Sequence, residues 1–292
     1  MAPDEPAAVA IHRALSSGVQ RLRASEAPAR RREPEGIHRM RTSARRLRSV
    51  LRTFQELLEP TWAEALEDEL KWLGQRLGEV RDLDVLQDRL ATDAGDARPA
   101  LEPLFESLRV RTEASRRALD EALDGARFQE LMARLADAAD RPRLRDEAWQ
   151  PCRSALPGLV RKAWKRLKQR GRDLREDDPD EAFHEVRKRA KSARYAAEAV
   201  ANALGADTGR DAERFADQAR GVQDILGAHQ DAIVAGSEVT RIMVMFRDDR
   251  PFQEAAKSLC SRLDDSAQQS RDRFFKAWRK FDRKKLRRWL EK

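Results

Sequence analysis

The chain has few of the residues that build strands, disulfide frameworks or long loops. Its 292 residues include two cysteines, Cys152 and Cys260, and one tyrosine, while valine, isoleucine and threonine together number 25. Glycine and proline contribute 13 and 12 residues, which is below their usual joint share of about 12%. The two cysteines form neither a metal-ligand pattern nor a disulfide framework. These absences exclude a β-rich fold and a disulfide-stabilised secreted domain.

Long hydrophobic runs are also missing. No uninterrupted apolar stretch approaches the roughly 18 residues that a membrane-spanning helix needs. The N-terminal segment MAPDEPAAVAIHRAL has no apolar core of the kind found in signal peptides. Together with the scarcity of cysteine, this pattern favours a cytoplasmic protein that does not associate with membranes.

The composition that remains is typical of a charged helical protein. Alanine occurs 45 times and leucine 31 times, and both residues favour helices. Charged residues make up 38% of the chain, against about a quarter in an average domain, and Lys and Arg exceed Asp and Glu by eight. The hydrophobic share of 40% is still sufficient for a folded core in a chain of this length. We therefore predict an all-α fold.

Helical periodicity divides the chain into two similar series of helices. The pattern predicts helices over residues 7–23, 35–58, 62–90, 99–123 and 128–139, followed by 154–174, 179–204, 211–242 and 252–281. A basic loop, PARRREP, is predicted after the first helix, and a basic tail, KKLRRWLEK, ends the chain. Residues 140–150 separate the two series and are the best candidate for a boundary.

Two motifs occur twice in the same order. HRMRTSARRLR at 38–48 aligns with HEVRKRAKSAR at 184–194, and LGEVRDLDVL at 77–86 aligns with LGAHQDAIVA at 226–235. The two offsets, 146 and 149, differ by a loop-sized three residues. The repeat predicts two halves, residues 1–145 and 146–292, each resembling a four-helix bundle. We expect a pseudo-twofold axis to relate the halves around a basic central cavity.

The first motif of each half places basic side chains on one stripe of a helix, because its residues are spaced by three and four. Residues 36–58 contain six arginines and one acid, so the stripe has few local partners. Guanidinium groups bind phosphate oxygens in pairs, and two such stripes predict an anion site. The predicted contacts are His38, Arg41, Arg45, Arg48, His184, Arg187, Lys191 and Arg194.

Four blocks of the sequence resemble the conserved histidine α-helical domain (CHAD) family. They read HRMRTSARRLRSVLRTF at 38–54, WLGQRLGEVRDLDVL at 72–86, HEVRKRAKSARYAAE at 184–198 and VQDILGAHQDAIV at 222–234. The resemblance implies a pair of helical bundles whose basic central cavity binds inorganic polyphosphate through the histidines and basic residues of the two stripes. It also implies association with polyphosphate granules. The second copy departs from the pattern where Gln230 stands in place of Arg81.

Helical phase alone adds a second group of candidate contacts. These residues are Arg13, Arg52, Arg81, Arg161, Lys165, Lys168 and Lys188. Arg39 and Arg46 lie off the first stripe. Charge reversal at either should therefore weaken polyphosphate binding less than reversal at Arg41 or Arg187.

Two other functions compete with polyphosphate binding. A chain with a pI of about 9.8 attracts any polyanion, so nonspecific nucleic-acid binding is the main alternative. Against it, only 6% of the residues are aromatic and could stack on bases.

A metal-dependent phosphate-handling enzyme would depend on the four histidines, but no two lie at a spacing that places ligands on one helix face. We expect no catalysis, no metal and no cofactor, and weak contact with nucleic acid at low salt.

Overall fold

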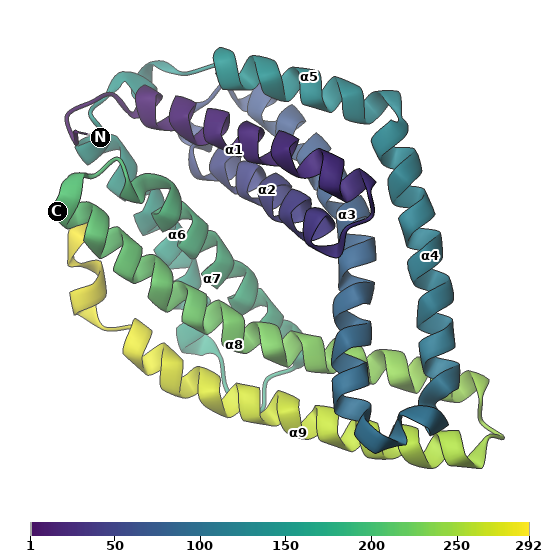
Figure 1. Cartoon of the computed structure of the whole chain (residues 1–292). Helices are drawn as coiled ribbons and strands as arrows, with labels where there is room; N and C mark the ends of the chain where they lie inside the picture. Colours follow the sequence, from purple (N-terminus) through teal and green to yellow (C-terminus); the bar gives the residue numbers. More distant parts are fainter. Residues whose placement is uncertain (1, 292) are drawn as a thin grey trace.

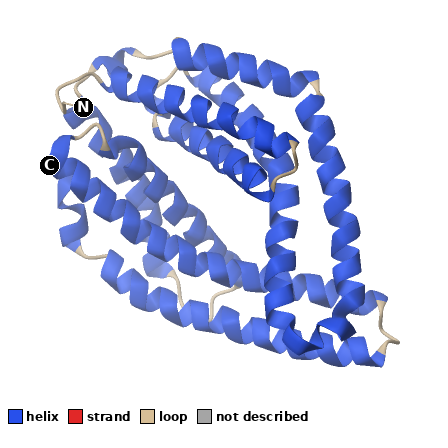
Figure 2. Ribbon diagram, in the orientation of Figure 1, coloured by secondary structure: helices blue, strands red, loops and turns tan. Residues whose placement is uncertain are grey.

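The computed structural model describes residues 2–291, and this part of the chain forms nine α-helices and no β-strand (Figures 1 and 2). The helices are α1 (Ala7–Arg30), α2 (Pro34–Thr53), α3 (Pro60–Ala94), α4 (Glu102–Asp124), α5 (Ala126–Asp140), α6 (Cys152–Asp173), α7 (Asp180–Ala201), α8 (Gly205–Met245) and α9 (Arg250–Phe281). A 3₁₀ helix, η4 (Lys284–Leu290), follows α9. The all-α prediction is confirmed.

The helix starts follow local signals in the sequence. The Glu59 side chain accepts hydrogen bonds from the first free N–H groups of α3, and Pro60 occupies the first turn. At α9, Asp249 caps the helix in the same way, and a proline again occupies the first turn. Such caps satisfy donors that have no intrahelical partner, and proline loses nothing at this position.

The first helix is longer than its sequence predicts. The prediction ended it at residue 23 with a loop around Pro28, whereas α1 continues through Pro28 to Arg30. A proline in the last turn removes few hydrogen bonds, and Gly36 of α2 packs directly against the Pro28 backbone. Arg30 is also held by Glu26 and Asp124. Tertiary contacts therefore extend a helix that local propensity would end.

The helices form two groups that two longer elements connect (Figure 1). Helices α1, α2 and α5 lie on one side, and α6 to α9 lie on the other. Helices α3 and α4 extend from the first group to the far ends of α8 and α9, which they contact. No helix between residues 2 and 291 is long and apolar enough to cross a membrane.

Two hydrophobic clusters hold this arrangement together. The larger contains the inner faces of α1, α2, α5, α6 and α7 and parts of α3, α8 and α9. The smaller joins the end of α3 and the start of α4 to the end of α8 and the start of α9. Both clusters take residues from both sides of position 145, so the predicted halves share their cores. The boundary between residues 145 and 146 itself stays a prediction.

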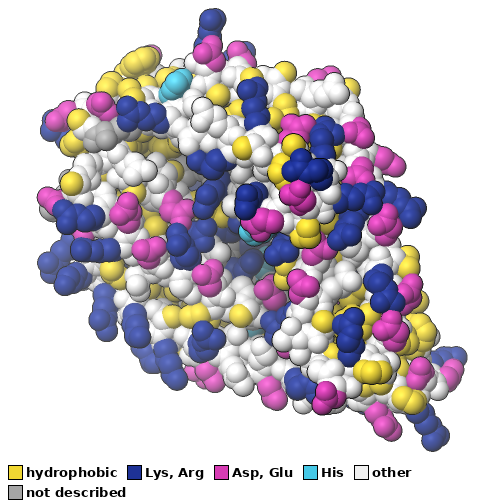
Figure 3. Space-filling model, viewed as in Figure 1, with side chains coloured by type: hydrophobic (Ala, Val, Ile, Leu, Met, Phe, Trp, Pro, Cys, Tyr) yellow, Lys and Arg dark blue, Asp and Glu magenta, His cyan; other side chains and the backbone are white. Residues whose placement is uncertain are grey.

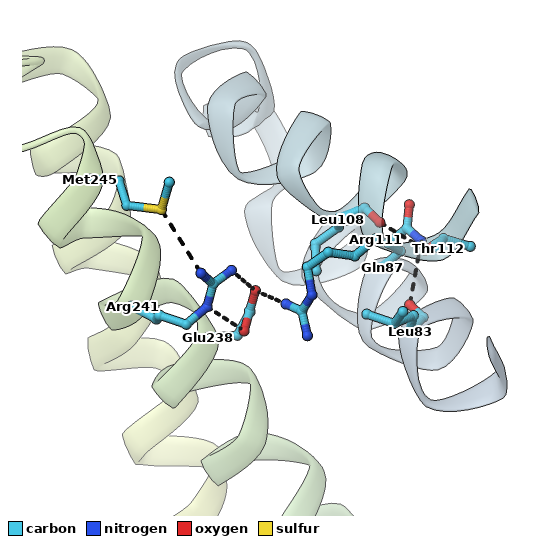
Figure 4. A network of polar contacts seen from close by, with 8 residues as sticks. All are labelled: Leu83, Gln87, Leu108, Arg111, Thr112, Glu238, Arg241 and Met245. Atoms are coloured by element: carbon cyan, nitrogen blue, oxygen red, sulfur yellow. Dashed lines mark hydrogen bonds and ion pairs between the residues drawn. The ribbon is translucent and has the colours of Figure 1, made fainter. Parts of the chain in front are cut away.

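A polar network supports the smaller cluster at the contact between α4 and α8 (Figure 4). The Glu238 carboxylate is 9% exposed and accepts from Arg111 of α4 and from Arg241 of its own helix, whose Nε lies 3.1 Å away. The two guanidiniums lower the pKa of Glu238 against the effect of burial. A buried carboxylate with two cations stays ionised and links the two helices.

Candidate functional site

Helices α2, α3 and α7 surround a basic cleft of about 540 Å³. One face of α2 is apolar and buried in the core, so the neighbouring face, with its basic stripe, turns toward α3 and α7. Four of the eight predicted contacts line this cleft, namely Arg41, Arg45, Arg48 and Lys191. Figure 3 shows the hollow between the two groups of helices, with Lys and Arg side chains around it. The fold thus brings the two stripes together.

Carboxylates on α3 neutralise part of the α2 stripe. Asp82 accepts from both terminal nitrogens of Arg41, at 2.7 and 3.2 Å. Glu67 accepts from Arg48 Nε at 3.2 Å. Both pairs are partly exposed, and such pairs contribute little to stability. They orient the two guanidiniums toward the cleft and leave them accessible to a stronger anion.

Two other arginines of the stripes, Arg45 and Arg187, have a buried Nε with no hydrogen-bond partner among the described residues. Burial lowers the pKa of Arg45, despite the neighbouring Tyr195 hydroxyl. The guanidinium of Arg194 stacks 4.5 Å from the Tyr195 ring and lies 3.2 Å from a Glu198 oxygen. Unsatisfied buried donors are unfavourable unless a ligand accepts from them.

The strongest electrostatic perturbation in the cleft is at Lys191. Burial, followed by the positive charges of Arg45, Arg187, Arg41 and Arg48, lowers the pKa of Lys191 to about 7. Desolvation and like charges both disfavour the ammonium form. Five cations from two helices therefore lie close enough to repel one another.

The two motif histidines have different surroundings. Partial burial of the His38 ring and the nearby Arg81 guanidinium lower the pKa of His38. His184 Nδ1 lies 2.7 Å from Gln230 Oε1. With the amide oxygen as acceptor, Nδ1 donates this hydrogen bond and the second ring nitrogen, Nε2, stays available to another partner.

The two copies of the motif make the same contact with the following helix. The Arg41 guanidinium lies over Gly78 of α3, and the Arg187 guanidinium lies over Gly227 of α8. In each case a side chain at the glycine would meet guanidinium atoms at about 3.6 Å. Asp231 of the second copy aligns with Asp82 of the first. Burial raises the pKa of Asp231, and the positive charge of Arg187 partly offsets that rise.

The second group of candidates is dispersed. Arg81 lines an adjoining cavity of about 510 Å³ between α3 and α4, and Arg13 lines a larger cavity of about 930 Å³ between α1, α2 and α7. Arg52 pairs with Glu67, Lys188 with Glu185, and Arg161 donates to the backbone of η4. Lys165 and Lys168 are on α6, away from the cleft.

Some cleft residues were missed by the sequence analysis. The α3 wall consists of Leu70, Lys71, Gly74, Gln75, Gly78, Glu79 and Asp82. Their spacing places them on one face of a helix, which is the signal that could have identified them. Arg46, chosen from the sequence as an off-stripe control, lines the 930 Å³ cavity, whereas Arg39 pairs with Glu35 on the exposed surface.

Comparison with known proteins supports the family and the fold. A sequence model of the CHAD domain matches residues 13–240. Uncharacterized proteins from two strains of Mycobacterium tuberculosis are each 33% identical over 244 residues, which cover 79% of this chain and 45% of the relative. The chain thus spans less than half the length of these relatives.

Two solved structures share the fold. PptA from Streptomyces chartreusis superposes with a TM-score of 0.79 at 21% identity, covering 94% of this chain and 99% of that chain. The CHAD domain from the plant Ricinus communis superposes with a TM-score of 0.70 at 24% identity, covering 96% and 93%. Because the sequence match covers both copies of the repeated motif, the chain belongs to the CHAD domain family.

Proposed function

We propose that this protein binds inorganic polyphosphate in the cleft between α2, α3 and α7 and catalyses no reaction on it. The observation that carries the proposal is the cation cluster around Lys191, where burial and four guanidiniums lower the pKa of the ammonium to about 7. An anion relieves this repulsion and accepts from the buried arginine donors. A phosphate polymer offers oxygens to several guanidiniums at once.

The lining of the cleft favours a ligand without bases. None of the described residues that line it is aromatic, so a single-stranded nucleic acid would find no surface on which to stack. The charged groups instead follow the two stripes from Arg41 to Arg48 and across to Lys191. Successive phosphates of a flexible chain can contact them in turn, without readout of any sequence.

We further propose that the two halves arose by duplication and are related by a pseudo-twofold axis. The matched contacts of Arg41 with Gly78 and of Arg187 with Gly227 support this, because all four residues fall on the two motif alignments. The bound polymer would then pass from the Arg41 side to the Arg187 side. A cytoplasmic protein with this property would associate with polyphosphate granules.

The proposal is tested by titration with long-chain polyphosphate and with single-stranded DNA of matched charge. Polyphosphate binding should persist at about 300 mM salt, whereas DNA binding should be lost, because DNA held only by screened charges dissociates as salt rises. Equal affinities that decline together would refute a preformed phosphate cleft.

Variants locate the binding. Reversal of Arg41 and Arg187 to glutamate should weaken polyphosphate binding by at least about a hundredfold, since each charge-assisted contact contributes roughly 1.5–3 kcal/mol. Arg39→Glu is the control, because Arg39 is exposed and pairs only with Glu35. An equal loss in the control would mean that binding follows net charge alone.

A further inference from the structure

Most of the positive charge of this protein lies outside the cleft. Residues 161–173 of α6 and residues 273–291 of α9 and η4 together contain sixteen Lys and Arg and three Asp and Glu. Their excess of thirteen positive charges is larger than the +8 of the whole chain, so the rest of the protein is net acidic. Neither segment contributes a residue to the cleft. We call the surface of these two segments the outer basic face.

The two segments form one continuous surface. Trp164 of α6 stacks on Trp278 of α9, with ring centroids 6.1 Å apart. Arg172 pairs with Asp282 at 2.8 Å, and Arg161 donates to the backbone of η4. Figure 3 shows a row of Lys and Arg side chains along the edge where Figure 1 places the C-terminal part of α9. The aromatic contacts pack α6 against α9, so the cations of both segments lie on the same outer side of these helices.

The cations of this face are largely unpaired. Within residues 2–291, twelve of the sixteen form no ion pair and no side-chain hydrogen bond. Several are like-charged neighbours one helical turn apart, as are Lys276 and Lys280 on α9 and Arg166 and Arg170 on α6. Such pairs destabilise a helix. A surface that concentrates them with few counter-charges is suited to an extended polyanion.

The apolar side chains restrict the class of polyanion. Five aromatic residues of the two segments are buried in the core, namely Trp164, Phe274, Trp278, Phe281 and Trp289. The sixth, Phe275, is partly buried and packs edge-on against Phe183 and Phe274. The face therefore offers few rings on which an unpaired base could stack. The exposed large hydrophobic residues of the described chain all lie elsewhere, so this face has nothing to insert into a bilayer. We propose that the outer basic face binds the phosphate backbone of double-stranded nucleic acid without reading its sequence.

This binding does not depend on the polyphosphate cleft. If about half of the twelve unpaired cations contact one side of a duplex, the logarithm of affinity should fall with the logarithm of salt concentration with a slope of about −5. Affinities for duplexes of unrelated sequence should agree within about threefold, because the contacts are to phosphates alone.

The test compares two double variants with the same change of charge on the same helix. Lys276→Glu with Lys280→Glu should lower the affinity for a duplex DNA by at least about tenfold and reduce the salt slope by about two. The control is Arg250→Glu with Lys257→Glu, at the other end of α9, where both side chains are exposed. Its duplex affinity should stay within about twofold of wild type. Fluorescence anisotropy measures both, and circular dichroism confirms that the variants are folded.

Measuring polyphosphate and duplex DNA binding for each variant distinguishes the outer basic face from the polyphosphate cleft. The outer-face variant should still bind polyphosphate in the cleft, and the Arg41→Glu, Arg187→Glu variant should still bind duplex DNA. The proposal is wrong if the outer-face variant binds duplex DNA as tightly as wild type, or if the control loses as much. It is also wrong if phosphatidylserine vesicles bind this face more tightly than duplex DNA at equal phosphate concentration, since the partner would then be a membrane.

Discussion

Replacing Lys191 with methionine should stabilise the free protein. The pKa of Lys191 falls from 10.5 to about 7 on folding, which corresponds to an unfavourable free energy of about 3 to 5 kcal/mol for the protonated native state. Methionine keeps an unbranched side chain and removes the charge. Because the unfolded chain holds the extra proton between pH 7 and 10.5, wild-type stability rises with pH through this window. The gain from Lys191→Met should therefore be largest below pH 7 and disappear near pH 10.5.

The same substitution should weaken polyphosphate binding. Bound phosphates favour the ammonium form of Lys191, so the wild type takes up a proton on binding above pH 7, and its affinity should fall by up to about tenfold per pH unit. The interval from pH 8 to 10 lies above the ordinary pKa of histidine, about 6.5, and includes most of the range over which the lysine changes charge. The variant should bind more weakly at pH 7 and lose this slope.

Thermal unfolding at several pH values and calorimetric titration with polyphosphate measure the two effects. An increase in Tm of at least about 5 °C is expected at pH 6. Lys188→Met is the control, because Lys188 is exposed on the same helix and pairs with Glu185. If Lys191→Met is less stable than wild type at pH 6 and binds polyphosphate equally at every pH, the electrostatic reasoning is wrong.

Three further substitutions test single contacts. Asp82→Asn should raise polyphosphate affinity about threefold or more, because Asp82 competes for Arg41; isothermal titration would show no change if the pair is irrelevant to binding. Gly171→Ala should destabilise the protein by about 1–3 kcal/mol in denaturant unfolding, because a methyl group there overlaps the Trp278 ring; unaltered stability would mean that the ring moves freely. Glu238→Gln should cost about 1–3 kcal/mol by leaving two guanidiniums without a carboxylate, and an unchanged midpoint would argue against a structural role for this network.

The number and order of the helices could be predicted from the sequence because their signals are local. Apolar residues at helical spacing, prolines in the first turn and acidic caps specify α3 and α9 within a few residues of their observed ends. The end of α1 could not be predicted, since it depends on the close approach of Gly36 to Pro28 and on the ion pair of Arg30 with the distant Asp124.

Prediction of the site was limited in the same way. The stripes of Arg41, Arg45 and Arg48 and of Lys191 follow from spacing alone, and the structure places them in one cleft. The position of each side chain around its helix also led to Lys165 and Lys168 being predicted as polyphosphate contacts, but both lie on α6, on the outer basic face. Helical phase gives the direction of a side chain about its own axis, whereas the neighbouring helix decides whether that direction is a cleft or the outer surface.

The sequence by itself determined that this protein is helical, that its basic motif occurs twice, and that the motif belongs to the CHAD family. Periodicity and composition act within each helix, so they need no knowledge of its neighbours. Only the tertiary structure decided which cations share a cleft, which carboxylates neutralise them, and which lysine has its pKa lowered to about 7. Those properties depend on distances between helices far apart in the chain, because electrostatic interaction and desolvation depend on position in space and not on position in sequence.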